Sequence, residues 1–99
     1  KMRIPSKYKI AGKEIIVELV DNISDGSTYG DFNDAKGLIR IANRIKVEDE
    51  WITLKDCDKL NTFWHEAFHS FQYYWNNKCD EDFAQILANF MCEFLESSE

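Results

Sequence analysis

The residues best suited to chemistry lie in the segment His65-Glu66-Ala67-Phe68-His69, which contains both histidines of the chain. In a helix, side chains four positions apart lie one above the other, so both imidazoles could bind one metal ion. Glu66 would then be directed toward a water molecule on that metal. The spacing predicts a hydrolytic zinc site. The competing interpretation is an ordinary histidine pair on the surface of an amphipathic helix.

A catalytic zinc site needs a third protein ligand, and the chain has no third histidine. The downstream candidates are Cys79, Asp80, Glu81 and Asp82. Glu81 is preferred because it shares a helical face with small residues that would let a second helix approach closely. These small residues are Ala84, Ala88 and Cys92. Two alternatives stay open, since Cys79 could bind zinc as a thiolate and the carboxylates could simply complement the positive end of a helix.

Two helices must position these residues. The first is predicted by apolar side chains at spacings of three and four between Leu60 and Trp75. We expect it to begin near Thr53, with Thr53 or Asp56 as its cap. Its aromatic side should pack in the core, and its polar side should face a cleft. The aromatic side comprises Phe63, Trp64, Phe68, Phe71 and Trp75. The polar side comprises Asp58, Thr62, His65, His69, Gln72 and Asn76.

A second helix is predicted after a break in the pattern at Asn76-Asn77-Lys78. Asp80 is a good N-cap residue for it. Its apolar stripe runs from Phe83 to Leu95, and we expect this stripe to point into the core, led by Phe83, Ile86 and Phe90. The two helices should therefore lie in antiparallel contact.

The first half of the chain reads as β-structure, with two pairs of strands around turns at Ala11-Gly12-Lys13 and at residues 33–37, and a polar loop at 21–27. The expected strands are Tyr8–Ile10, Glu14–Val20, Thr28–Phe32 and Leu38–Ala42. The predicted fold class is α+β, in which a small antiparallel or mixed sheet of about four strands is followed by two packed helices. Residues 1–99 are expected to form a single minimal domain of this kind.

The composition of the chain argues against two classes of partner, nucleic acids and membranes. A net charge of -6 argues against a nucleic-acid partner, because phosphate binding needs clustered Lys and Arg. The chain contains no run of about 18 apolar residues, so we expect no membrane partner. The three cysteines, Cys57, Cys79 and Cys92, form an odd set without CxxC spacing, which predicts reduced thiols and a cytoplasmic location. The oligomeric state does not follow from the sequence.

The HEAFH segment, followed by Glu81-x-x-Ala84 and Leu87-Ala88, resembles the zinc helix and glutamate helix of the gluzincin metallopeptidases. The likeness is greatest to the small ImmA/IrrE-like metallopeptidases of bacteriophages and mobile elements. This resemblance implies that His65, His69 and Glu81 bind Zn²⁺ and that Glu66 is the general base. It also implies a peptide or protein substrate and a phage-derived role.

Two departures from the gluzincin pattern affect the expected site. Gln85 occupies a position where gluzincins often carry an acid that orients a ligand histidine, and an amide there would raise the basicity of that histidine less. The gap from His69 to Glu81 is also short, at 12 positions. Tyr73 or Tyr29 would stabilise the oxyanion. The rival function is a non-catalytic zinc-binding module for protein interaction or regulation.

Overall fold

A computed structural model describes residues 3–76 and 79–98 of the chain. The elements follow in the order β1 (Lys7–Ile10), β2 (Lys13–Val20), a short 3₁₀ turn (Ser24–Gly26), β3 (Gly30–Asn33), β4 (Leu38–Ala42), β5 (Arg44–Val47), β6 (Glu50–Thr53), α1 (Asp56–Phe71), a π-helical turn (Gln72–Asn76) and α2 (Glu81–Ser97). The structure is α+β, with a mixed sheet followed by two packed helices, as predicted.

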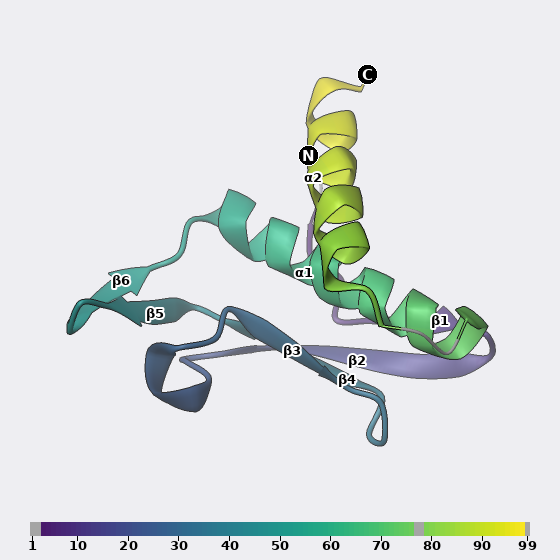
Figure 1. The fold of residues 1–99 in the computed structure, drawn as a ribbon, viewed down its shortest axis with the longest axis horizontal. Helices are drawn as coiled ribbons and strands as arrows, with labels where there is room; N and C mark the ends of the chain where they lie inside the picture. The colour runs from purple at the N-terminus through teal and green to yellow at the C-terminus, as the bar shows by residue number, and fades with distance from the viewer. Residues whose placement is uncertain (1–2, 77–78, 99) are drawn as a thin grey trace.

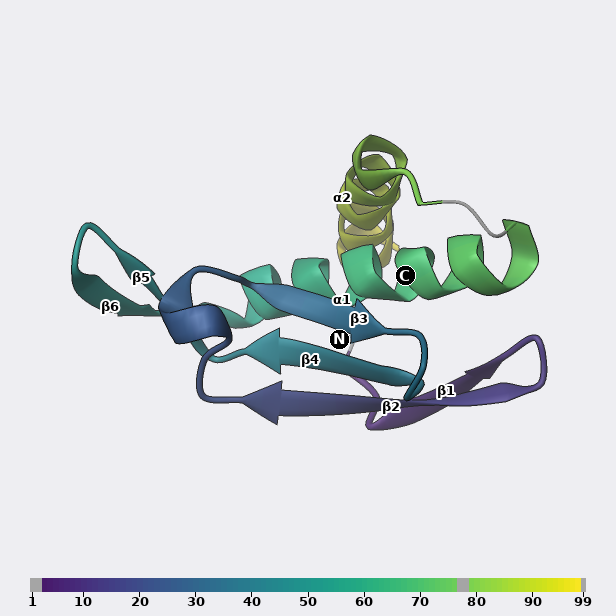
Figure 2. The ribbon, with the colours of Figure 1, turned by 60° about the horizontal axis from the view of Figure 1, so that its bottom comes forward.

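The main sheet has the strand order β1-β2-β4-β3. The two predicted antiparallel hairpins, β1–β2 and β3–β4, are confirmed. The hairpins join through β2 and β4, which run parallel with Ile16 opposite Leu38. This order places β4 inside the sheet and leaves β3 at an edge beside α1, as Figure 2 shows.

One face of the sheet packs against α1 and forms the core. Ile15, Ile39 and Ile41 are fully buried there, and they meet Phe63 and Ala67 of α1. The hydroxyl of Tyr8 on β1 also lies 2.7 Å from Oγ of the buried Ser70 on α1. The sheet thus fixes the depth and rotation of the helix that carries the histidines.

A third hairpin, β5–β6, forms a separate two-stranded sheet and was not predicted. It turns at Glu48 and Asp49, both with positive φ, and Ile45 pairs with Ile52. Its charged composition hid the strand pattern, and Val47, Trp51 and Ile52 remain exposed. The hairpin also displaces the start of α1. Thr53 is the last residue of β6, and the cap position falls on Lys55, which makes no side-chain capping bond, so the prediction of Thr53 or Asp56 as cap is wrong.

The helices pack differently from the prediction. Asp80 does cap α2, since its Oδ1 accepts a hydrogen bond from the backbone N–H of Phe83 at 3.0 Å. However, α2 crosses α1 steeply instead of lying antiparallel along it (Figures 1 and 2). Ala84 and Ala88 are fully buried where α2 meets α1. The predicted break before α2 falls partly on residues 77–78, which lie outside the described residues.

Because the helices cross steeply, much of the apolar stripe of α2 does not pack in the core as predicted. Phe83, Ile86 and Phe90 were predicted to enter the core, but they are 47%, 63% and 57% exposed. They lie on the side of α2 opposite the buried alanines, where no element of the described chain covers them. At the end of α1 the aromatic side behaves similarly. Phe63 is buried as predicted, whereas Phe71 and Trp75 are exposed.

Candidate metal centre

His65 and His69 project from the same side of α1, one helical turn apart. Their rings meet edge to face with centroids 4.7 Å apart, and their Nε2 atoms are separated by 3.1 Å. The side chain of His69 is buried and that of His65 is mostly so. The i, i+4 spacing therefore brings two metal-ligating nitrogens to one point, as the sequence predicts.

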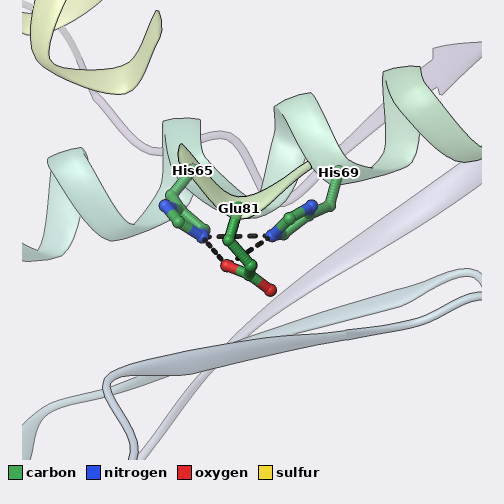
Figure 3. A group of neighbouring side chains, drawn as sticks. All are labelled: His65, His69 and Glu81. Atoms are coloured by element: carbon green, nitrogen blue, oxygen red, sulfur yellow. Dashed lines mark hydrogen bonds and ion pairs between the residues drawn. The ribbon is translucent and has the colours of Figure 1, made fainter. Parts of the chain in front are cut away.

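Glu81, the first residue of α2, completes a three-residue group (Figure 3). Its Oε1 lies 2.9 Å from Nε2 of His65 and 3.1 Å from Nε2 of His69. One ligand atom from each residue lies within 4.8 Å of the others, so the group could hold a metal ion. Burial raises the pKa of Glu81, but the hydrogen bonds that the two imidazoles donate from Nε2 when they are protonated outweigh this effect and hold the pKa below its usual value.

The other candidate third ligands lie elsewhere. Cys79 is exposed, and its Sγ is 3.8 Å from Nδ1 of His69, on the side of the ring away from Glu81. The carboxylate of Asp80 caps α2, and Asp82 is exposed in the first turn of that helix. Of the four candidates from the sequence, the structure brings only Glu81 together with both Nε2 atoms within the described residues.

Glu66 lies on the buried side of α1, next to the edge strand β3, and is 8% exposed. Burial is the main cause that raises its pKa to about 7, with His65 lowering it and Glu81 raising it further. A carboxylate with such a pKa can both accept and release a proton near neutral pH. Its position suits the role of general base that the sequence pattern assigns to it.

Gly30 makes the close approach of β3 to α1 feasible, a role that the sequence analysis missed. A Cβ added at Gly30 would lie 2.5 Å from Cγ2 of Thr62 and 3.6 Å from Cγ of Glu66. Any side chain at this position would push the strand away from the helix. The signal available in the sequence was a glycine inside a predicted strand, which often marks a close backbone approach.

The two imidazoles are oriented by the only two glutamines of the chain. Nδ1 of His65 lies 2.8 Å from Oε1 of Gln85, and Nδ1 of His69 lies 3.1 Å from Oε1 of Gln72. Because an amide oxygen can only accept, each Nδ1 donates its proton, and in the neutral imidazole each Nε2 then has a free lone pair for a metal. Gln85 was expected near a ligand histidine, whereas the role of Gln72 was not foreseen.

Each glutamine is held in turn by further hydrogen bonds. Nε2 of Gln85 donates to Oδ1 of Asn61 and to Oδ1 of Asn89, both at 2.9 Å. Gln72 is buried and bonds twice to the backbone of Asp80, donating to its carbonyl and accepting from its N–H, both at 3.3 Å. These bonds fix which end of each amide faces the histidine. The bonds from Gln72 also tie the π-helical turn after α1 to Asp80, the residue before Glu81.

Two open cavities flank the three ligands and share Gly30, Glu66 and Glu81 in their walls. The larger, of about 710 Å³, lies between α1 and α2 and is bordered by Tyr29. The smaller, of about 510 Å³, lies along β3 and is bordered by Tyr73. The nearby Asp34 carboxylate raises the pKa of Tyr73. The two predicted oxyanion stabilisers therefore border different halves of the cleft.

Comparison of the chain with protein-family models, with curated proteins and with solved structures found no match. Within the described residues, no helix is both long enough and apolar enough to cross a membrane.

Proposed function

We propose that this chain is a zinc-dependent metallopeptidase of gluzincin type, resembling the ImmA/IrrE-like enzymes. The observation that carries the proposal is the convergence of two imidazole Nε2 atoms and the Glu81 carboxylate, with Glu66 buried one position after His65. Two histidines and one glutamate form a ligand set typical of catalytic zinc, which keeps a fourth position open. The two Nδ1–H groups bonded to glutamine fit metal binding through Nε2.

Each residue of the site would have a distinct role in hydrolysis. His65, His69 and Glu81 hold Zn²⁺, which when bound supplies Lewis-acid activation of water and of the peptide carbonyl. Glu66 takes a proton from the attacking water and delivers it to the leaving amine. Tyr73 or Tyr29 would donate a hydrogen bond to the developing oxyanion.

The substrate would be an extended peptide segment of a protein. Among the described strands, β3 pairs only with β4, so its other edge is free. Gly30 on this strand brings the free edge next to Glu66, and the smaller cavity runs along it. A peptide that adds to this edge would form main-chain hydrogen bonds and cross the zinc position. The strand position thus supports a peptide substrate.

The decisive experiment compares Glu66→Gln with the parent protein. Zinc-loaded protein is incubated with unfolded proteins and a peptide library, and cleavage is followed by mass spectrometry. We expect chelator-sensitive cleavage in the parent and a loss of about 10² to 10⁴ in rate in Glu66→Gln, with zinc content unchanged. Asp58→Asn, another acid of the same cavity on α1, is the matched control and should cleave normally. Equal rates in parent and Glu66→Gln would exclude the proposed mechanism.

A second candidate is a non-catalytic zinc-binding module for protein interaction or regulation on the same fold. The observation in its favour is that neutral amides, rather than carboxylates, orient both histidines. Such partners raise imidazole basicity less, so the zinc site could serve mainly to hold α1 and α2 together. Zinc binding without any cleavage, in the parent and in Glu66→Gln alike, would favour this candidate.

A further inference from the structure

The outer face of α2 carries a continuous run of large apolar side chains, which we call the α2 stripe: Phe83, Ile86, Phe90 and Phe94. Each of them is between 47% and 63% exposed. Their spacings of three, four and four place them along one side of the helix. The rings of Phe90 and Phe94 are stacked, with centroids 5.8 Å apart. The stripe is therefore a single surface and not four scattered residues.

Folding of the described chain does not bury this stripe. The helix crosses α1 and rises away from the sheet (Figure 1). Its contact side carries the fully buried Ala84 and Ala88, and the stripe lies on the opposite side. Single exposed apolar residues are ordinary, but a contiguous row of large ones usually marks an interaction surface.

One edge of the stripe is acidic. Asp82 and Glu93 are both exposed, and a separation of 11 positions places them almost in line along the helix, beside the stripe. The segment 79–98 contains no Lys, Arg or His that could neutralise them. A partner that covers this surface must therefore bring apolar side chains together with positive charge.

We propose that the α2 stripe is the docking surface for a basic amphipathic helix of a partner protein. Apolar side chains of that helix would cover Phe83, Ile86 and Phe90, and its Lys or Arg residues would pair with Asp82 and Glu93. Pairing with α2 of a second copy fits less well, because that helix brings no basic residue to the acidic edge. This inference is independent of the proposed peptidase activity.

Two fluorescein-labelled designed peptides of about 20 residues test the proposal. Both have leucine along one helical face, with lysine flanking that face in one peptide and glutamate in the other. Fluorescence anisotropy with the whole chain should detect binding of the lysine peptide and none of the glutamate peptide. The charge-reversed variant Asp82→Lys/Glu93→Lys should invert this preference.

The contribution of the stripe itself is measured with Phe90→Ser, which should weaken binding of the lysine peptide by about tenfold or more. Leu19→Ser on β2 is the matched control, since Leu19 is 53% exposed and Phe90 is 57% exposed. It should leave the affinity unchanged. Both sites are at the surface, and circular dichroism checks that both variants fold.

Three results would overturn the proposal. The first is equal affinity for the two peptides, or no binding of either. The second is a dimer in sedimentation experiments that dissociates in Phe90→Ser, because a second copy would then occupy the stripe. The third is binding to phosphatidylcholine vesicles that Phe90→Ser abolishes, because the occupant would then be a membrane surface.

Discussion

At the scale of single residues, the candidate metal centre depends on which nitrogen of each histidine is free. Gln85 and Gln72 accept from the two Nδ1–H groups, so in the neutral imidazoles both Nε2 atoms point toward Glu81 without protons. A neutral amide fixes the ring as a carboxylate would, but it adds no negative charge behind the imidazole. The two glutamines thus fix the orientation of both imidazole rings, but the rings are less basic than they would be with carboxylate partners.

The first prediction concerns metal stoichiometry. Elemental analysis and zinc titration should give one Zn²⁺ per chain, and His65→Ala should weaken binding more than about a hundredfold. The reason is that His65 supplies a ligand atom, whereas loss of an outer partner alone typically costs 10- to 100-fold. Full zinc affinity in His65→Ala would contradict the assignment.

The second prediction concerns Gln72, which orients His69 and holds the backbone of Asp80 beside Glu81. Gln72→Ala should lower zinc affinity about 10- to 100-fold, because it frees the imidazole and loosens the start of α2. Gln72→Glu should recover part of the loss, since a carboxylate can accept from Nδ1–H of His69 and from the backbone N–H of Asp80 but cannot donate to the Asp80 carbonyl. Competition with a chelating dye measures both affinities. An unchanged affinity in Gln72→Ala would mean that Gln72 does not position His69.

At the scale of secondary-structure elements, the site depends on how closely β3 approaches α1. The strand backs onto the helix at Gly30, where Thr62 occupies the space that a side chain would need. The same contact determines the distance from Glu66 to the free edge of β3. A change at Gly30 should therefore affect stability and the cleft together.

The third prediction is that Gly30→Ala lowers the free energy of unfolding by about 1 to 3 kcal/mol, because its Cβ would also meet the Arg40 carbonyl at 2.9 Å. Urea denaturation measures the change. Gly12→Ala is the control: it meets nothing within 4 Å, and at φ +78° it should cost only about 1 kcal/mol. Thr62→Ala in the Gly30→Ala background should recover part of the loss. An equal cost at the two glycines would argue against the close contact.

At the scale of the whole molecule, the candidate ligands join two helices that also pack against each other through Ala84 and Ala88. His65 and His69 come from α1 and Glu81 comes from α2, whose outer side is uncovered. A bound metal would therefore link α2 to the body formed by the sheet and α1. Metal binding to the folded state alone should stabilise the whole chain.

The fourth prediction follows from this link. Zinc at 100 times its Kd should stabilise the fold by about 2.7 kcal/mol, and a chelator should remove this gain and lower the Tm. Thermal unfolding with and without chelator measures the effect. In Glu81→Gln the difference in Tm between the two conditions should become much smaller. A Tm that is insensitive to chelator in the parent would mean that the metal does not join the helices.

The sequence by itself determined the local features, because they depend on short spacings. The i, i+4 histidines, the cap at Asp80 and the hairpin around Gly12 all follow from neighbouring residues. The α+β class followed from the change of apolar period between the two halves. Glu81 was also chosen from local spacing, because it shares a helical face with the small residues Ala84 and Ala88. In the structure these two alanines are buried against α1.

Only the tertiary structure decided the relations between distant segments. The β2–β4 pairing, the β5–β6 hairpin and the steep crossing of the helices depend on which surfaces meet, and apolar spacing does not encode this. The stripe at Phe83 and Phe90 has the same spacing as a core stripe, so the sequence could not tell that it stays exposed. The role of Gln72 likewise depends on its hydrogen bond to Asp80, eight positions along the chain. A periodic pattern identifies an apolar face, but the approach of another element decides whether that face is buried.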